Sequence, residues 1–288
     1  MKKITLQLLI VFALAFSVSA QENKPELFDE FGEMPIDEMR FRVINLALEV
    51  NKVPNSKALI EIYGRQKRSF ASAYIRGSLM KSIWEKFIKL PPEKLLIQFC
   101  NINKEPILTK LSVVRENDKI EPCDENLIVP KETVLFESSY FDVTDFSVSE
   151  IKFISVENDY PSVEGTEGNY SEIAQNVLKK FLKNSPGSRI YIIAYLNANF
   201  ETIENDEFVT KKIPVLDRKS HANKMFRAAR KVLIKNGFSP SQIVAIDGGY
   251  VKGNERRLEF WFVPNGGDIP KPQPDYFPKR AKRTLRPG

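Results

Sequence analysis

The residues most suggestive of a working loop are Asp247-Gly248-Gly249-Tyr250, in the stretch QIVAIDGGYVKGNERRLEFWFVP from Gln242 to Pro264. A carboxylate beside two glycines is compatible with a loop that holds a phosphate or another substrate. A glycine-rich anion loop, however, leads from a strand into a helix, whereas another strand-forming run follows here. The pattern therefore favours a hairpin connection from Asp247 to Asn254, in which Gly248 and Gly249 provide backbone freedom.

Other residues with catalytic potential lack the partners that catalysis needs. The chain has a single histidine, His221, and a Ser-His-Asp triad, a Cys-His pair or a His-rich zinc site each requires histidine in defined company. Acidic clusters lie at residues 29–33, 37–38 and 204–207, but acid–base work by two carboxylates needs a cleft that shifts one pKa. We therefore predict no catalytic or metal site and no cofactor. The alternative is a secreted hydrolase with an unrecognised carboxylate-based site.

The first 20 residues, MKKITLQLLIVFALAFSVSA, have the form of a secretory signal peptide. Lys2 and Lys3 precede an apolar run from Ile4 to Val18, and small residues follow at Ser19 and Ala20. The apolar run is shorter than the roughly 20 residues that a spanning helix needs, which favours cleavage over an uncleaved anchor. The sequence therefore predicts an exported protein, periplasmic or extracellular, with no transmembrane segment in the mature chain.

The charge of the mature chain argues against a nucleic-acid surface. Cleavage removes Lys2 and Lys3 and no acidic residue, so 41 basic and 37 acidic residues remain, a net charge of +4. Much of this excess lies in the tail from Lys279 to Arg286, and the body of the chain is close to neutral. Residues 268–288 place prolines between charges, so we predict a disordered, Pro-rich basic tail.

Cysteine is sparse, with Cys100 and Cys123 only. In an exported protein an even pair suggests one disulfide, and two separate buried thiols are the alternative. Oxidation is the default outside the cytoplasm, which favours the disulfide.

Two halves of the chain repeat one order of predicted elements. Residues 37–64 align with residues 169–196, each containing an amphipathic helix, a turn and a strand rich in β-branched residues. Residues 79–114 align with residues 225–263, each containing a helix, a Pro-bearing loop, a strand, a polar turn and a second strand. We interpret this repeated order, α-β-α-β-β, as duplication of one module. The alternative is that any two α/β domains look alike at this level.

The order of elements predicts an α/β fold of two modules, each a small sandwich of a mixed sheet with its helices on one face. We assign the parts of the chain as signal peptide 1–20, first module 21–123, linker plus first strand of the second module 124–168, second module 169–267 and tail 268–288.

Four segments of the second half follow one another in an order known from one family. They are the turn Asn184 to Gly187, the strand RIYIIAYLN ending at Asn197, the helix from Arg227 to Gly237 and the closing segment Arg256 to Phe260. This order resembles an OmpA-like, peptidoglycan-associated domain, with its K-N-P turn, G-H-T-D strand end, R-A helix start and closing R-R-V-E strand. The resemblance covers about the last third of the chain and is fainter in the first half.

The resemblance implies candidate ligand-binding residues. In OmpA-like domains an Asp at the end of G-H-T-D accepts from the ammonium of diaminopimelate, and an Arg on the next helix pairs with its carboxylate. The Asp position falls on Asn197, where an amide replaces the carboxylate, and the Arg position falls on Arg227, with Lys224 as the alternative. In the first half the Asp position falls near Arg65, which has the opposite charge.

Two loops are further candidates for recognition. The short basic loop with Arg65 and Arg68 is a hypothesis for binding a carboxylate or a glycan phosphate. The segment from Asn199 to Asp217 is long for its place between strand and helix, and is either a recognition loop or a plain surface excursion.

Further motifs are FDEFG at Phe28 to Gly32, Tyr63-Gly64 at a strand end, QIVAIDGGY at Gln242 to Tyr250 and LEFWFVP at Leu258 to Pro264. They resemble a group of uncharacterised exported bacterial proteins with FDEFG, RIVxxDGGY and ELWxVP motifs, a likeness that brings no activity with it. We expect FDEFG to be a small docking strand or turn. We expect an exported, non-enzymatic binding or interaction protein of the cell envelope, with peptidoglycan or another envelope protein as partner. The oligomeric state is open.

Overall fold

The computed structural model describes residues 23–66, 69–123, 129–141, 167–197, 199–204, 207–212, 218–251 and 256–274. The predicted signal peptide, Arg68 and residues 275–288 lie outside the described residues. None of the helices within these ranges is long and apolar enough to cross a membrane.

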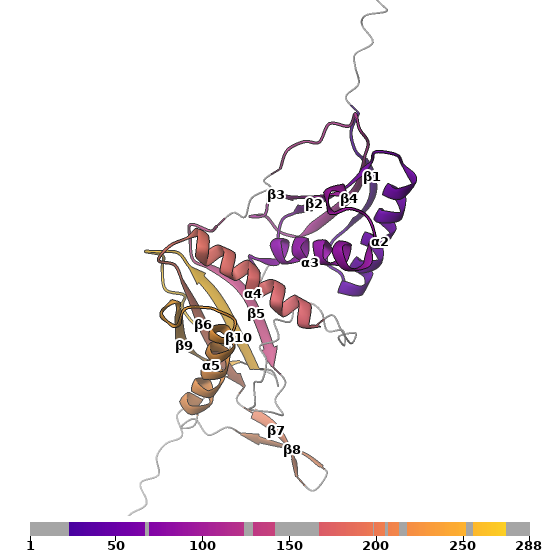
Figure 1. Ribbon diagram of the computed structural model, residues 1–288. Coiled ribbons are helices and arrows are strands. Elements are labelled where there is room, and N and C mark those ends of the chain that lie inside the picture. The colour runs from indigo at the N-terminus through magenta and orange to yellow at the C-terminus, as the bar shows by residue number, and fades with distance from the viewer. Residues whose placement is uncertain are drawn as a thin grey trace, which may run out of the picture.

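Both halves of the chain contain helices and strands (Figure 1). The first half contains β1 (Glu26–Phe31), α2 (Ile36–Lys52), β2 (Lys57–Tyr63), α3 (Ser72–Phe87), the 3₁₀ turn η1 (Pro92–Lys94), β3 (Leu95–Cys100) and β4 (Leu108–Val114). The second half contains β5 (Val134–Phe141), α4 (Glu167–Asn184), β6 (Arg189–Asn197), β7 (Asn199–Glu204), β8 (Glu207–Lys212), α5 (Arg218–Lys235), the 3₁₀ turn η3 (Pro240–Gln242), β9 (Ile243–Val251) and β10 (Arg256–Val263).

The two halves form two four-stranded sheets with the same strand order and the same orientations. The first sheet has the order β1-β4-β2-β3 and the second the order β5-β10-β6-β9. In each sheet the last pair, β2 with β3 or β6 with β9, is parallel and the other pairs are antiparallel. The predicted fold class, an α/β protein of two modules with mixed sheets, is confirmed.

Each four-stranded sheet contains one strand more than the order α-β-α-β-β predicts. β1 contains most of the FDEFG motif and pairs with β4, so this motif is a strand of the sheet itself. β5 lies in the segment expected to donate a first strand to the second module, and it pairs with β10. The segment from Asn199 to Asp217 contains the hairpin of β7 and β8.

The registers align the two sheets residue by residue. β2 begins opposite the last residue of β4, and β6 begins opposite the last residue of β10. Tyr63 and Tyr195 therefore occupy equivalent positions, and the alignment of residues 37–64 with residues 169–196 places them together as well.

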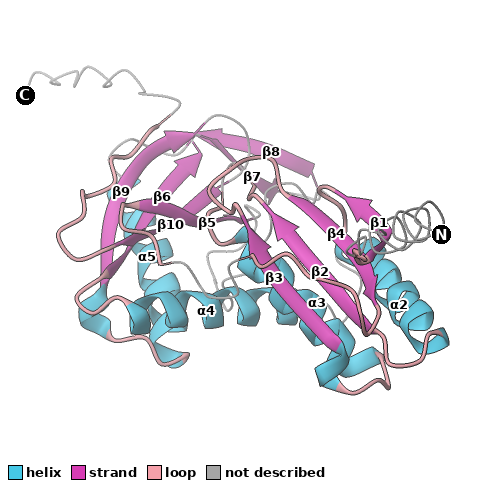
Figure 2. Ribbon diagram, turned by 90° about the horizontal axis from the view of Figure 1, so that it is seen from above, coloured by secondary structure: helices cyan, strands magenta, loops and turns pink. Residues whose placement is uncertain are grey.

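The helices lie in one layer and the strands in another (Figure 2). α2 has Asp37 and Glu38 in its first turn, where negative charge meets the positive end of the helix dipole. Its buried residues recur at helical spacing: Met39, Val43, Leu46, Ala47 and Val50. They pack in one core with the β2 residues Ala58, Ile60 and Ile62. Because side chains alternate along a strand, the remaining β2 residues, including Glu61 and Tyr63, point to the opposite face.

The chain between β2 and α3 joins the modules through backbone hydrogen bonds. The Phe70 amide donates to the Leu135 carbonyl at 2.9 Å, and the Ala71 amide donates to the Phe136 carbonyl at 3.4 Å. Ser69 Oγ lies 3.0 Å from the Phe136 carbonyl oxygen and 2.9 Å from Oε2 of Glu137. Since β5 is an edge strand of the second sheet, these contacts satisfy backbone groups that would otherwise be left at a bare edge.

Aromatic packing completes the contact between the modules. The Phe181 side chain on α4 is fully buried. Its ring centroid lies 6.1 Å from that of Phe70 and 5.8 Å from that of Tyr74 in the first module. It also lies 5.6 Å from both Phe136 and Phe262 in the second module. One continuous core therefore runs through both sheets.

Two sequence predictions are corrected here. β9 continues to Val251, so the prediction that a hairpin connection starts at Asp247 is wrong. The strand absorbs the glycine pair as a bulge, because Ala194 pairs with Asp247 and Tyr195 pairs with Gly249. Gly249 has a φ of +88° and its amide donates to Oδ1 of Asp247 at 3.0 Å, which is the αL conformation that glycine adopts readily.

The second correction concerns residues 268–274, which the sequence assigns to a disordered tail. Pro270 is buried, the Asp268 carbonyl accepts from Oγ1 of Thr133, and the Gln273 amide donates to the Tyr195 hydroxyl. These contacts form because the segment returns across the second sheet.

We predict that Phe181→Ala uncouples the modules. The substitution leaves a cavity between them and lowers the free energy of unfolding by about 4 kcal/mol. Urea unfolding followed by circular dichroism should change from one transition to two. The control is Phe238→Ala, a buried second-module residue that should destabilise the protein without splitting the transition. A single transition in Phe181→Ala would contradict the shared core.

Candidate functional site

The carboxyl end of β2 is built around Gly64, which follows Tyr63. Gly64 has a φ of +67°, and a Cβ at this position would lie 2.4 Å from the Pro106 carbonyl oxygen. The Gly64 amide donates to the Cys100 carbonyl at 3.1 Å, and the Arg65 amide donates to the Lys104 carbonyl at 2.8 Å. Glycine therefore lets the connection between β3 and β4 fold back over the end of β2.

A pocket of about 590 Å³ opens between this connection, the end of β2 and the chain that follows β1. Its lining includes the phenol of Tyr63 and charged side chains of both signs: Glu33, Lys104, Glu105 and Lys110. We call this the β2–β4 pocket. A lining with both ammonium and carboxylate groups suits a ligand that itself carries both charges.

Tyr63 is the neutral donor of the β2–β4 pocket. Its hydroxyl donates to Oε1 of Glu61 at 3.1 Å. Burial and the neighbouring Glu61 carboxylate raise the pKa of Tyr63 to about 12. Nζ of Lys110 lies 5.3 Å from the centre of the Tyr63 ring and 3.4 Å from Oε2 of Glu30. At neutral pH the phenol therefore stays protonated and acts as a hydrogen-bonding group.

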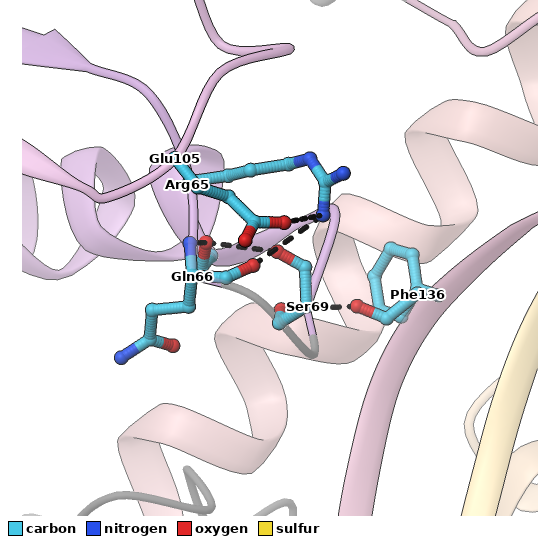
Figure 3. Close-up of polar contacts among 6 residues, drawn as sticks. Arg65, Gln66, Ser69, Glu105 and Phe136 are labelled. Atoms are coloured by element: carbon cyan, nitrogen blue, oxygen red, sulfur yellow. Dashed lines mark hydrogen bonds and ion pairs between the residues drawn. The ribbon is translucent and has the colours of Figure 1, made fainter.

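Arg65 lies at the edge of this pocket, and its guanidinium is held by an ion pair and an aromatic contact within the protein (Figure 3). Its Nη1 lies 3.3 Å from Oε1 of Glu105, and its guanidinium lies 5.9 Å from the centre of the Phe70 ring. Ser69, a few residues later, turns towards Phe136 of the second module. Arg65 thus lies between the pocket and the contact that joins the modules, and its charge is balanced by a residue of the pocket lining.

A returning segment covers the sheet face that carries Tyr63. After β4 the chain leads to Cys123, which forms a disulfide with Cys100, the residue paired with Tyr63. The Cys123 amide also donates to Oε1 of Gln98 at 3.0 Å. We call residues 115–123 the first strap. The prediction of a Cys100–Cys123 disulfide is confirmed.

The Glu61 carboxylate lies beside this disulfide. One of its oxygens and the two sulfurs lie within 4.8 Å of one another. A metal ion is bound by thiolates, and these sulfurs are bonded to each other. The group is therefore a structural contact under the first strap.

The structure does not bring the predicted binding residues into one site. Arg65 lies at the β2–β4 pocket, and Arg68 lies outside the described residues. Asn197 is the last residue of β6 and pairs with Val251 in the second sheet, while Arg227 is an exposed residue of α5. Their roles in ligand binding stay predictions.

Comparison with family models, with curated proteins and with solved structures finds no match to the chain.

Sequence reasoning missed most of the β2–β4 pocket. It singled out Tyr63-Gly64 as a motif at a strand end without assigning it to a site. Lys110 and Glu105 carried a weaker signal, because the first interrupts an apolar strand and the second precedes a proline. Only the register of β2 against β4, which pairs Glu61 with Lys110 and Tyr63 with Leu108, places these groups around one opening.

Removal of the disulfide should loosen the first strap. The bond joins residues 23 positions apart, and closing a loop of this length stabilises a fold by about 3 kcal/mol. We predict that the double substitution Cys100→Ala and Cys123→Ala lowers the free energy of unfolding by that amount in urea titrations. An unchanged free energy of unfolding would show that the strap is held without the bond.

Alkaline pH should destabilise the protein through Tyr63. The folded chain keeps the phenol protonated up to a pKa of about 12, whereas the unfolded chain loses this proton near 10.0. The stabilisation is fully present below pH 10 and is lost as pH rises towards 12. We predict that the free energy of unfolding falls over this interval and falls less in Tyr63→Phe. Equal slopes in both chains, measured by urea unfolding at several pH values, would contradict this assignment.

Proposed function

We propose that the protein is an exported, non-enzymatic binding protein of the cell envelope and that the β2–β4 pocket holds its ligand. The observation that carries the proposal is the 590 Å³ opening with two lysines and two glutamates in its lining. It lies at the carboxyl ends of the parallel strands β2 and β3, the end of an α/β sheet at which ligands commonly bind.

The groups around the pocket favour binding over catalysis. The phenol of Tyr63, with a pKa of about 12, is not a base at neutral pH. Lys110 forms an ion pair with Glu30, and Glu105 forms one with Arg65. Such groups suit fixed hydrogen bonds and ion pairs with a bound molecule.

The proposed ligand is the peptide part of peptidoglycan, which carries ammonium and carboxylate groups close together. Support comes from the two signs of charge in the lining and from the OmpA-like resemblance of the second module, which the first module shows more faintly. An envelope protein that presents the same pair of charges is the other partner that the pocket would accept.

Binding to the cell wall can be measured by co-sedimentation. The mature chain, residues 21–288, is incubated with purified peptidoglycan sacculi and the bound fraction is measured after centrifugation. Lys104→Glu reverses an exposed charge of the pocket lining, and we predict that it weakens binding about tenfold, the loss of one charge-assisted contact.

The matched control is Lys57→Glu. Lys57 is exposed at the opposite end of β2, so the same charge change should leave binding at the wild-type level. Equal losses in both variants would indicate non-specific attraction, and sacculi that retain no wild-type protein would exclude the cell wall as the ligand.

A further inference from the structure

The second module has its own covered face, which carries a buried tyrosine. Ile193, Tyr195 and Val251 form a small apolar cluster with Ile246 and Trp261, separate from the main core. Ala194 and Leu196, which alternate with Tyr195 along β6, belong to that main core. Tyr195 therefore lies on the sheet face away from the core, at the position equivalent to Tyr63 in the first module.

A buried carboxylate fixes the direction of the Tyr195 hydroxyl. This hydroxyl donates to Oε2 of Glu259 at 3.1 Å, and Nε1 of Trp261 donates to the same oxygen at 3.0 Å. Nε of Arg257 lies 3.1 Å from Oε1 of Glu259, and the Arg257 guanidinium lies 4.3 Å from the centre of the Tyr195 ring. Because burial raises the pKa of Tyr195, the phenol keeps its proton for Glu259. Its oxygen lone pairs are left to accept from another donor.

That donor is the chain itself. Residues 264–274, which we call the second strap, return over this face after β10, and the Gln273 amide donates to the Tyr195 hydroxyl at 3.1 Å. The strap ends in Ile-Pro-Lys-Pro-Gln-Pro, from Ile269 to Pro274. Proline has no amide hydrogen, so Gln273 carries the one backbone N–H between Pro272 and Pro274.

Local sequence favours an extended, polyproline-like form for this segment. Lys271 and Gln273 each precede a proline, which disfavours the helical region for both, and proline itself fixes φ near −65°. Such segments bind aromatic-lined grooves at low entropic cost, because little conformational freedom is left to lose.

The glycine pair of β9 makes room for the segment. A Cβ at Gly248 would lie 2.7 Å from the Tyr195 ring, and a Cβ at Gly249 would lie 3.0 Å from Cβ of Pro274. Gly248 therefore allows the tyrosine ring to lie against the backbone of β9, and Gly249 leaves space for the last proline of the strap.

We propose that the face formed by Tyr195, Glu259, Trp261 and Gly249 is a binding site for peptides of the Pro-X-Pro type, and that the second strap is its bound intramolecular ligand. The hydroxyl of Tyr195 selects the amide of the central residue, and the glycines accommodate the flanking proline. A Pro-X-Pro segment of another protein then competes with the strap for the same groups.

The experiment uses the full mature chain and a fluorescein-labelled IPKPQP peptide, with binding followed by fluorescence anisotropy. Gln273 is exposed, and Gln273→Pro removes the amide hydrogen from the strap without changing the site. We predict that Gln273→Pro binds the peptide about fivefold more tightly than the wild type, the worth of one hydrogen bond. The control peptide IPKPPP, which lacks the central amide hydrogen, should lose this advantage.

Tyr195→Phe added to Gln273→Pro should return peptide binding to the wild-type level, because the acceptor is gone. A chain that ends at Ile269 lacks the Gln273 amide and the prolines of residues 270–274, and it should bind the peptide at least as tightly as Gln273→Pro. Thermal unfolding checks that each variant is folded. The proposal is overturned if neither strap variant binds more tightly than the wild type, if IPKPPP binds as well as IPKPQP, or if Tyr195→Phe leaves the gain intact.

Discussion

A small sheet that carries its helices on one face leaves its other face to be covered by some other part of the chain. In this protein the segment that follows the last strand of each module covers that face. Residues 115–123 return to β3 and are fixed by the Cys100–Cys123 disulfide, and residues 264–274 return to β9 and contact Tyr195 and Gly249. The two straps follow from this one constraint, and each covers the sheet face that carries the equivalent tyrosine, Tyr63 or Tyr195.

The two modules differ in how the covering strap is held and in whether a pocket stays open. In the first module the strap is held covalently, and a pocket with charged groups remains open at the end of β2. In the second module the equivalent tyrosine is engaged by a backbone amide of the strap and is almost fully buried. Phe181 packs between the modules and makes one core of both, so that a single protein presents an open pocket in one module and a covered sheet face in the other.

Periodicity in the sequence was enough to predict the α/β class and two modules with mixed sheets, because apolar spacing reports the faces that enter the core. The FDEFG motif was expected to be a small docking strand or turn, but the exposed residues Leu27 and Phe28 give no clean alternation that would place β1 in the sheet itself. Periodicity also did not predict the bulge that keeps Asp247 and the glycines inside β9. The β2–β4 pocket depends on register and on the backbone of Gly64, which link residues far apart in the sequence. Residues 268–274 of the second strap have the composition of a disordered tail and are ordered by contacts with Tyr195 and Thr133.

We propose that the β2–β4 pocket is the ligand site of this protein. The most direct measurement is an NMR titration of isotope-labelled mature chain with a soluble peptidoglycan fragment that retains the peptide. If the pocket holds the ligand, amide shift changes will be concentrated at Gly64, Asn101, Lys104 and Ile107 and will saturate as the fragment is added. Saturating changes confined to the second sheet, or no changes at any concentration, would contradict it.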